Sequence, residues 1–586
     1  MNMVKVPACG DDEEYTRPPP NCYDRGKVPG GDQGGEKLKE ADNYEEVYGS
    51  FAWEVPAFLN MGVEVCDKHA DADGARTALI FENENGDVTQ YSFQALKGLS
   101  NKFANLLNAK GLERGDRLGI LLPQSMETGI AHIAAWKAGL ISIPLFTLFG
   151  EDALKFRLSD SGARALVTDT ENLGKIEAIL GDLPDLEVVF VTGAKRDGNA
   201  IVDLWQGLDA ARDVFAPVNT GADEPAFISY TSGTTGNPKG ALHAHRTMIG
   251  HLPGMEFPHE FFPQAGDLMW TPADWAWIGG LMNALMTAWY HGVPVLAHRA
   301  RKFDPEHAVR LMARHQVRNT FMPPTALKLM REVENPAERF GVKLRTVAVA
   351  GEPMGAELLE WGRQALGVGF NEFYGQTECN LVTANCGRIM EARPGSMGRA
   401  VPGHRVEIID ADGNVLGAEE EGHIAVKSPD PVMFLEYWND AEATKEKYLG
   451  DWLLTGDRGA KDADGYFWFL GREDDVITSA GYRIGPGEIE DCLVRHPAVA
   501  LAAVIGIPDP LRTERIKAFI QLRPGNNGDP DLEQDIRDFV NRRLSPHEKP
   551  RLIEFVDRLP MTATGKIKRK DLRDAEIAKL EKEKEA

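Results

Sequence analysis

The stretch Tyr230-Thr-Ser-Gly-Thr-Thr-Gly-Asn-Pro-Lys239-Gly240 decides how the rest of this sequence is interpreted. Its glycines let the backbone approach an anion closely, and its hydroxyl and amide groups can surround phosphate oxygens. Lys239 adds a positive charge. The apolar run at residues 226–230 predicts a buried strand before the stretch, and we expect a helical stretch after it. The segment therefore predicts a phosphate-binding loop.

The segment is neither a Walker A loop nor a dinucleotide-binding turn. The G-x-x-x-x-G-K-[ST] spacing of a Walker A loop is not met, and neither is the G-x-G-x-x-G spacing of a dinucleotide turn. Taken alone, a loop of this composition is also compatible with a turn that binds nothing. The interpretation therefore depends on what the remainder of the chain contains.

The length and patterning of the chain predict several domains. With 586 residues, the chain exceeds what one compact core organises. Strand and helix patterns alternate between residues 92 and 350, which predicts an α/β fold with stacked, largely parallel sheets. After about Pro394, short strands and Asp-Ala-Asp-Gly turns predict a β-barrel-like subdomain. Residues 475–570 predict a small α+β domain.

These patterns give three segments with approximate boundaries. Residues 1–45 are rich in proline, glycine and charge, and we expect a disordered arm there. Residues 46–473 are expected to form the large N-terminal domain, and residues 474–586 a mobile C-terminal domain.

Charge and cysteine usage exclude several classes of function. A formal charge of −24 argues against nucleic-acid binding, which needs clustered lysine and arginine. The 6 cysteines are scattered without metal-site spacing, so we expect reduced thiols in a cytoplasmic protein. No apolar run is long enough to span a bilayer.

Six further segments follow the loop in order, and they allow a family to be recognised. They are Ala350-Gly351-Glu352-Pro353, Tyr374-Gly-Gln376-Thr377-Glu378, Thr455-Gly-Asp457, Gly471-Arg472-Glu-Asp474-Asp475, Gly481-Tyr-Arg483 and Thr564-Gly565-Lys566. With the first loop they closely resemble the motifs of the adenylate-forming superfamily, which includes acyl-CoA synthetases, luciferases and peptide-synthetase adenylation domains. The resemblance covers about residues 45–575.

The resemblance implies ATP, Mg²⁺ and coenzyme A as ligands and assigns roles to the motif residues. Asp457 resembles the ribose-binding carboxylate, Arg472 and Arg483 resemble basic phosphate contacts, and Glu378 resembles the Mg²⁺ ligand. Thr377 resembles the contact to the α-phosphate. The remaining residues implied to bind ATP or AMP are Thr231, Ser232, Gly233, Thr234, Thr235, Gly236, Lys239, Gly351, Glu352, Pro353, Tyr374 and Gln376.

The resemblance also implies a moving domain with a catalytic lysine. Lys566 resembles the lysine that touches carboxylate and α-phosphate while acyl-AMP forms and pyrophosphate leaves. Asp474 falls at the family's hinge, and Gly481 resembles the residue that lines the tunnel for the CoA thiol. Acylation of Lys566 would remove its charge, so lysine-acylating and deacylating enzymes are hypothetical partners.

The identity of the acid is the least determined feature. Trp277, Ile278 and Gly279 resemble acyl-pocket residues, although an aromatic cluster of this kind also suits a plain core. Acetyl-specific relatives carry a tryptophan just before Gln-Thr-Glu, where this chain has Gly375. Residues 479–490 resemble the acetyl/medium-chain acyl-CoA synthetase branch. We therefore expect a short- to medium-chain carboxylic acid, with acetate or propionate left open.

Other classes remain as alternatives. A stand-alone enzyme that loads a carrier protein would share every motif, but no phosphopantetheine attachment segment occurs in the sequence. A luciferase-like oxygenase would need a large aromatic pocket. A nucleotide sensor without activity would be expected to lack Lys566 or Glu378, and both are present.

Overall fold

The computed structural model describes residues 37–193, 200–231, 238–351, 354–472, 475, 477–479, 482–509, 513–541, 543–544, 548–562 and 565–585. These residues form four sheets, three of them before residue 473. Phosphate-loop residues 232–237 lie outside the described residues.

An eight-stranded sheet contains the two strands that flank the phosphate loop. Its order is β19-β9-β8-β4-β3-β5-β6-β7, and neighbouring strands from β8 to β7 run parallel. The strands are β3 (Arg117–Leu121), β4 (Ile141–Pro144), β5 (Ala165–Asp169), β6 (Val188–Thr192), β7 (Ile201–Asp203), β8 (Pro225–Thr231), β9 (Lys239–Ala244) and β19 (Glu436–Tyr437).

A nine-stranded sheet supplies much of the candidate site. Its order is β16-β15-β14-β13-β12-β10-β11-β1-β2, with a parallel centre and antiparallel strands at both ends. The strands are β1 (Thr77–Glu82), β2 (Val88–Ser92), β10 (Met269–Trp270), β11 (Val295–His298), β12 (Asn319–Met322), β13 (Thr346–Val349), β14 (Phe370–Gln376), β15 (Cys379–Ala384) and β16 (Arg399–Ala400).

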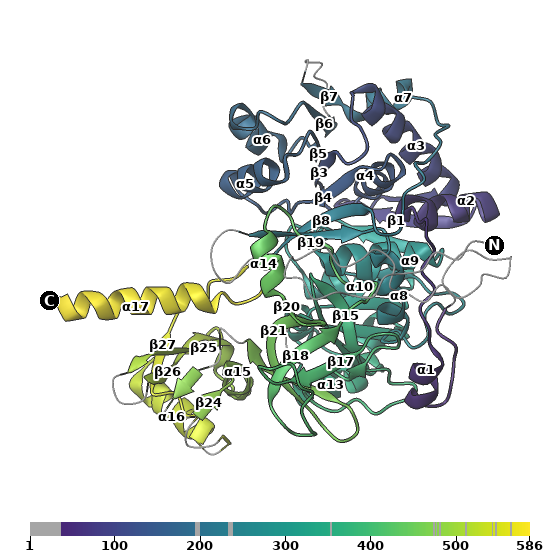
Figure 1. The fold of residues 1–586 in the computed structure, drawn as a ribbon. Coiled ribbons are helices and arrows are strands. Elements are labelled where there is room, and N and C mark those ends of the chain that lie inside the picture. Colours follow the sequence, from purple (N-terminus) through teal and green to yellow (C-terminus); the bar gives the residue numbers. More distant parts are fainter. Residues whose placement is uncertain are drawn as a thin grey trace, which may run out of the picture.

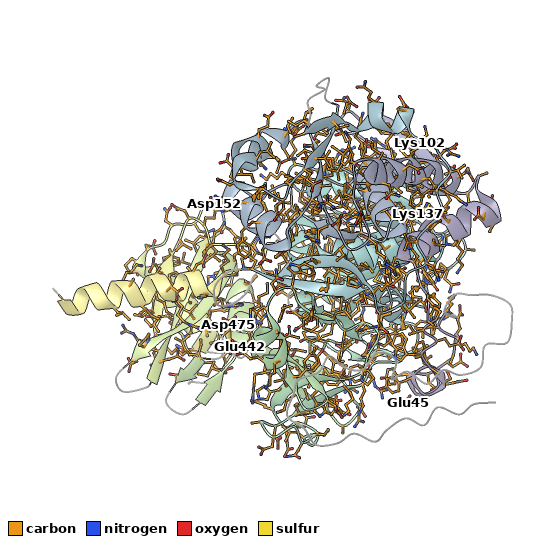
Figure 2. The ribbon with its side chains drawn as sticks, turned by 45° about the horizontal axis from the view of Figure 1, so that its top comes forward. Glu45, Lys102, Lys137, Asp152, Glu442 and Asp475 are labelled. Atoms are coloured by element: carbon orange, nitrogen blue, oxygen red, sulfur yellow. The ribbon has the colours of Figure 1, made fainter. Side chains whose placement is uncertain are left out.

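A shared helical layer joins these two sheets. One buried cluster combines apolar residues of both sheets with α3 (Phe93–Ala109), α4 (Met126–Lys137), α8 (Thr247–Glu256) and η3 (Gly279–Met286). Ser92 caps α3 by accepting a hydrogen bond from the Ala95 amide at 3.2 Å. Buried Lys137 pairs with Asp67 at 2.5 Å, and Figure 2 shows it among the helices of this layer.

The remaining helices before residue 473 connect the strands and cover the sheets. They are α1 (Tyr44–Ser50), η1 (Val63–Asp67), α2 (Lys68–Asp73), α5 (Glu151–Ser161), α6 (Leu173–Ile179), η2 (Leu180–Asp182), α7 (Leu204–Ala210), α9 (Thr287–Tyr290), α10 (Pro305–His315), α11 (Pro324–Met330), α12 (Pro336–Phe340), α13 (Ala356–Trp361), η4 (Gly362–Leu366) and α14 (Ala441–Glu446).

The third sheet is antiparallel throughout and confirms the change from α/β alternation to short strands that was predicted after about Pro394. Its strands are β17 (Val406–Ile409), β18 (Gly422–Lys427), β20 (Tyr448–Leu449), β21 (Trp452–Lys461) and β22 (Phe467–Arg472). The predicted fold class, with α/β layers and an added antiparallel subdomain, is therefore confirmed.

The fourth sheet belongs to a small α+β domain with a core of its own. Figure 1 shows this domain beside the antiparallel subdomain, with its last helix projecting outward. Asp475 lies where the small domain begins (Figure 2). The elements are β23 (Ile477–Ser479), β24 (Tyr482–Ile484), β25 (Val499–Asp509), β26 (Thr513–Leu522), β27 (Leu552–Phe555), α15 (Pro486–Val494), α16 (Pro530–Asn541) and α17 (Arg569–Glu585).

One local prediction is wrong. The residues after the phosphate loop form strand β9 and not a helix, and helix α8 begins only at Thr247. Strand β9 pairs antiparallel with β8 on one side and with β19 on the other. Pairing on both edges satisfies the backbone of these buried residues, and this tertiary context overrides their local pattern.

The end of the predicted N-terminal arm packs on the large domain. The Leu38 amide donates to Glu256 Oε2 at 2.7 Å, and Leu38 and Tyr44 are buried. Residues 1–36 of that arm lie outside the described residues. No helix in the part of the chain that the structure describes is both long and apolar enough to cross a membrane.

Candidate active site

The motif residues gather at the carboxyl ends of strands β13 and β14, where ligands bind in open α/β sheets. Gly351 follows β13, while Tyr374, Gly375 and Gln376 end β14. Residues from the antiparallel sheet and from the small domain approach the same place.

Asp457 is the centre of a hydrogen-bonded group between two sheets. The Tyr374 hydroxyl donates to Asp457 Oδ2 at 2.5 Å, and Arg472 Nε lies 3.6 Å from Asp457 Oδ1. The register of β21 and β22 places Asp457 directly opposite Arg472. Backbone pairing therefore brings together two residues that are separated in the sequence motifs.

The surroundings of Asp457 act on its charge in opposite directions. Burial raises the pKa of Asp457, whereas Arg472, the Tyr374 hydroxyl, Lys447 and Lys566 oppose that rise. The carboxylate is thus poorly solvated yet surrounded by donors and cations. Such a group can accept hydrogen bonds from a neutral diol such as ribose.

Glu378 lies in a second, adjoining group that the sequence did not reveal. The Tyr437 hydroxyl donates to Glu378 Oε1, and Lys447 Nζ lies 3.9 Å from the same oxygen. Lys447 also donates to Gln376 Oε1 at 3.0 Å. No sequence signal singled out Tyr437 or Lys447, because both stand outside the motifs and reach the site only through tertiary packing.

The site fits a hard divalent cation. Glu378 is buried and offers carboxylate oxygens, the donor type that Mg²⁺ prefers together with phosphate oxygens and water. When bound, Mg²⁺ would neutralise charge on the ATP phosphates. Neighbouring Thr377 lies in the same turn between β14 and β15.

The strands on either side of the phosphate loop hold its two ends together. Thr231 lies opposite Lys239 in the register of β8 and β9, and Thr231 Oγ1 donates to the Lys239 carbonyl at 3.4 Å. Lys239 Nζ lies 5.2 Å from the centre of the Tyr437 ring. The loop entrance and the Glu378 group are therefore neighbours through Tyr437.

Lys566 of the small domain reaches this side of the large domain. Its Cε atom lies 3.9 Å from the point that a Cβ atom on Gly351 would occupy, and Trp277 Cη2 lies 3.5 Å from that point. Gly351 has φ of 102° and so adopts a conformation that favours glycine. The structure thus brings together three predicted site residues from distant parts of the sequence.

A tight turn presents Lys566. The Thr562 amide donates to the Lys566 carbonyl at 2.7 Å, and the Lys566 amide donates to Thr562 Oγ1 at 3.0 Å. Gly565 has φ of 84°, which supplies the left-handed residue that this turn needs. Gly565 and Lys566 of the predicted motif therefore lie in a turn that presents the lysine, whereas Thr564 lies outside the described residues.

Trp277 connects the site with an aromatic row. Its ring centre lies 5.4 Å from that of Phe321, and the Phe321 ring lies 5.4 Å from the Phe373 ring. Ile278 is buried, and a Cβ atom on Gly279 would lie 3.0 Å from Phe321. Trp277 thus lies between this core and Gly351, with its edge toward the site.

The backbone of Leu381 lies very close to Gly375. A Cβ atom there would lie 2.2 Å from the amide nitrogen of Leu381, because β14 and β15 form a tight hairpin. Glycine at this position is therefore required by the hairpin itself. A contribution of Gly375 to the acyl pocket stays a prediction from the resemblance.

Several predicted residues cannot be placed. Ser232, Gly233, Thr234, Thr235, Gly236, Glu352, Pro353, Asp474 and Gly481 lie outside the described residues. Arg483 belongs to strand β24. Next to the predicted hinge, Asp475 Oδ2 lies 3.3 Å from Arg569 Nη1.

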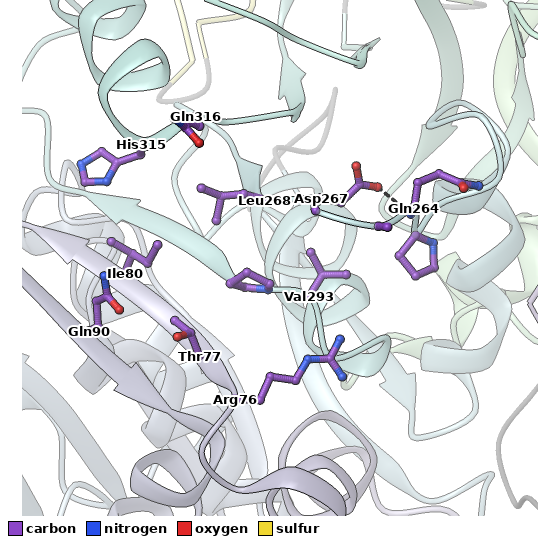
Figure 3. A pocket seen from close by; sticks show the side chains of 14 residues that line it. Arg76, Thr77, Ile80, Gln90, Gln264, Asp267, Leu268, Val293, His315 and Gln316 are labelled. Carbon is purple, nitrogen blue, oxygen red and sulfur yellow. Dashed lines mark hydrogen bonds between the residues drawn. The ribbon is translucent and has the colours of Figure 1, made fainter.

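A cavity of about 610 Å³ lies at the opposite edge of the nine-stranded sheet (Figure 3). Its lining includes Arg76 and Thr77 at the start of β1 and Leu268 just before β10. None of the predicted site residues lines it. This cavity is therefore distinct from the group around Asp457 and Glu378.

Comparison with known proteins identifies the family of this chain. The family model of the AMP-binding enzyme matches residues 66–438, and that of the AMP-binding enzyme C-terminal domain matches residues 488–566. The human mitochondrial acyl-coenzyme A synthetase ACSM4 is 36% identical over 536 residues, covering 89% of this chain and 91% of its own. The acetyl-coenzyme A synthetase of Bacillus subtilis is 34% identical, covering 93% and 96%.

Solved structures with the same fold include ligand complexes. The anthranilate CoA ligase AuaEII, solved with anthranoyl-AMP, superposes with a TM-score of 0.82 at 28% identity, covering 89% of this chain and 98% of that one. An acyl-CoA synthetase of Brucella canis gives 0.71 at 33% identity, covering 92% and 100%.

The chain belongs to the AMP-binding enzyme family. Within that family it is an ATP-dependent acyl-CoA synthetase, which uses ATP, Mg²⁺ and CoA and proceeds through an acyl-AMP.

Proposed function

We propose that this synthetase activates a short- to medium-chain carboxylic acid, and that Lys566 of the small domain promotes formation of the acyl-AMP. The observation that carries the proposal is the position of Lys566 beside Gly351 and Trp277. Formation of the adenylate brings a carboxylate and an α-phosphate, both negative, into contact. An ammonium group at that point stabilises the charge that concentrates in the transition state.

The other motif residues receive matching roles in this proposal. Asp457 and Arg472 hold the ribose side of ATP, and Glu378 holds Mg²⁺ beside Thr377 and the phosphate loop. Lys239 and Thr231 fix the two ends of that loop. Gly351 and Trp277 then bound the space between the nucleotide and the acyl chain.

Half-reactions of a lysine variant test the role of Lys566. Lys566→Ala should lower acid-dependent ATP–pyrophosphate exchange by at least about 100-fold, the scale of one lost charge-stabilising donor. Acyl-CoA formation from supplied acyl-AMP should change much less. Lys568→Ala is the matched control, since Lys568 is also exposed but pairs with Asp571 at 3.5 Å. Equal losses in both half-reactions would contradict the proposed role.

A ladder of acids tests the substrate class. Purified protein with ATP, Mg²⁺, CoA and straight or branched acids of two to ten carbons is expected to release AMP best in the middle of the range. A preference for acetate or propionate would favour the alternative of an acetyl/propionyl-CoA synthetase. AMP formation that needs a carrier protein in place of CoA would favour the carrier-loading alternative.

The second half-reaction is proposed to use a rotated small domain, with Asp474 as the hinge and Gly481 lining the thiol tunnel. Arg483 of β24 would then contact phosphate. Gly481→Leu should leave pyrophosphate exchange intact and abolish acyl-CoA release. Normal CoA turnover by that variant would refute the tunnel assignment.

We also propose that the enzyme works in the cytoplasm and that acylation of Lys566 inactivates it. Acylation removes the ammonium charge needed for adenylation. Fully acetylated protein with unchanged pyrophosphate exchange would refute this form of control.

A further inference from the structure

Glu82, His298 and His307 form a cluster outside the candidate active site. Glu82 ends strand β1, His298 ends the neighbouring parallel strand β11, and the register pairs these two residues directly. His307 lies in the first turn of α10, the helix that follows β11. One potential metal-ligand atom from each of the three side chains lies within 4.8 Å of the other two.

The two imidazole rings converge. His298 Nε2 lies 3.0 Å from His307 Nε2, while the ring centres are only 4.7 Å apart. If the two nitrogens were joined by a straight N–H···N hydrogen bond, the ring centres would be farther apart than 4.7 Å, because each nitrogen lies at the rim of its ring. The same two nitrogens can share a direct but bent N–H···N hydrogen bond, and they also lie close enough together to be ligands of one ion.

A backbone hydrogen bond sets the protonation of His298. Its Nδ1 lies 3.0 Å from the Glu82 carbonyl oxygen, which can only accept, so Nδ1 carries the hydrogen. In the neutral ring the lone pair is then on Nε2, the atom that faces His307. Metal-binding histidines are commonly oriented by such a bond from the second ring nitrogen.

The Glu82 carboxylate is buried and held in place. Its Oε1 accepts from Arg314 Nη1 at 2.7 Å, and its Oε2 lies 2.6 Å from His315 Nε2. An ionised carboxylate has about four lone-pair sites, so these contacts leave capacity for a further ligand bond. His307 is exposed, which gives an ion access from solvent and leaves positions for water.

We propose that Glu82, His298 and His307 bind one divalent transition-metal ion of the zinc class, with water completing the coordination. Two imidazole nitrogens and one carboxylate oxygen suit Zn²⁺ or Co²⁺ better than Mg²⁺, which prefers oxygen ligands. With metal–nitrogen bonds of about 2.0–2.1 Å, nitrogens at a tetrahedral angle are about 3.3 Å apart. The observed separation of 3.0 Å is slightly shorter, so a small opening of the two rings would admit the ion.

The ion would connect elements that adjoin the acyl-pocket segment. It would tie β1 and β11 to α10, and the His298 amide donates to Gln124 Oε1 at 3.3 Å. The Gln124 amide group in turn donates to the Thr271 and Ala273 carbonyls, at 3.0 and 2.7 Å. Since these carbonyls lie just before Trp277 in the chain, we assign the site a structural role.

Cobalt binding tests this site. Metal-free protein without a polyhistidine tag is titrated with Co²⁺ in excess Mg²⁺, and visible absorption and equilibrium dialysis report binding. The unmodified chain is expected to bind about one equivalent, and His307→Ala well below one, because loss of a ligand lowers affinity. Arg310→Ala, an exposed change on the next turn of the same helix, should bind as the unmodified chain does.

Thermal unfolding with Zn²⁺ supplies a second readout. Zn²⁺ should raise the Tm of the unmodified chain and of Arg310→Ala, but not of His307→Ala or His307→Gln, because only a bound ion stabilises the fold. Failure of the unmodified chain to bind Co²⁺ would overturn the proposal. Equal binding by His307→Ala and Arg310→Ala would also overturn it.

Discussion

The two domains hold their active-site residues by different means. In the large domain, Asp457 and Glu378 are buried, and neighbouring tyrosine hydroxyls donate to both. In the small domain, Lys566 is exposed and stands on a short turn that follows Gly565. The half of the site in the large domain is thus held by its own hydrogen bonds, whereas the half in the small domain is an exposed side chain that the proposed domain movement would bring in or remove.

This difference assigns separate tasks to the domains. A buried carboxylate that accepts a hydrogen bond is already oriented, so no free energy is needed to reorganise it during the reaction. This suits a residue that binds ATP. A lysine on a turn can leave without breaking a core, which suits a group needed for only one half-reaction. The small domain still needs internal rigidity, and Arg569 provides it three residues after Lys566.

The largest expected effect concerns that rigidity. Arg569 bonds both oxygens of Glu490, at 2.9 and 2.5 Å, and also contacts Asp475. Arg569→Met would leave these carboxylates unpaired and should lower the free energy of unfolding of the small domain by about 3–5 kcal/mol. Hydrogen exchange of residues 482–509 measures this. The neighbouring exposed change Lys570→Met should have little effect, and equal behaviour of both variants would contradict the assignment.

The next effect concerns the fixed half. Asp457→Ala removes the proposed ribose acceptor and leaves the Tyr374 hydroxyl without it, so kcat/KM for ATP should fall about 100-fold. Tyr374→Phe keeps the carboxylate and should cost only about fivefold. Steady-state kinetics at varied ATP measures both. If Tyr374→Phe lowered kcat/KM as much as Asp457→Ala does, the Tyr374–Asp457 hydrogen bond would be the important feature, and the role of Asp457 as ribose acceptor would be contradicted.

The smallest effect is a pH dependence in the segment before Trp277. Burial raises the pKa of Asp274 to about 6, from an ordinary value of 3.8. Between these values the folded chain holds a proton that the unfolded chain has lost, so stability falls as pH rises toward 6. Asp274→Asn abolishes that loss, while its side-chain oxygen can still accept from the Ala276 amide, which lies 2.8 Å from Asp274.

The Asn variant should therefore be more stable than the unmodified chain at about pH 7.5, by roughly 1–3 kcal/mol. The advantage should shrink as pH falls below about 6 and should vanish only below pH 3.8, where Asp274 is protonated in the folded and in the unfolded chain. Thermal unfolding across this pH range measures it. If the stability difference between Asp274→Asn and the unmodified chain did not vary with pH, the pKa of Asp274 would not be raised by folding.

Much of the fold and of the candidate site could be predicted because the motifs are local. Short segments of sequence are enough to show the order of the motifs and the alternation of strands and helices. They also show the change to short strands after about Pro394. The partners of the motif residues could not be predicted. Tyr437 and Lys447 reach Glu378 and Gln376 only when β19 and the start of β20 pack beside β14.

By itself, the sequence determined which chemistry the chain carries. The segment Thr564-Gly565-Lys566 singled out Lys566 as the candidate catalytic lysine, because it resembles the family's motif. Tertiary structure alone decided that β9 is a strand, that Leu381 closes on Gly375, and that Lys566 meets Gly351. These outcomes depend on pairing between segments far apart in the chain, and local spacing does not encode which segments pair.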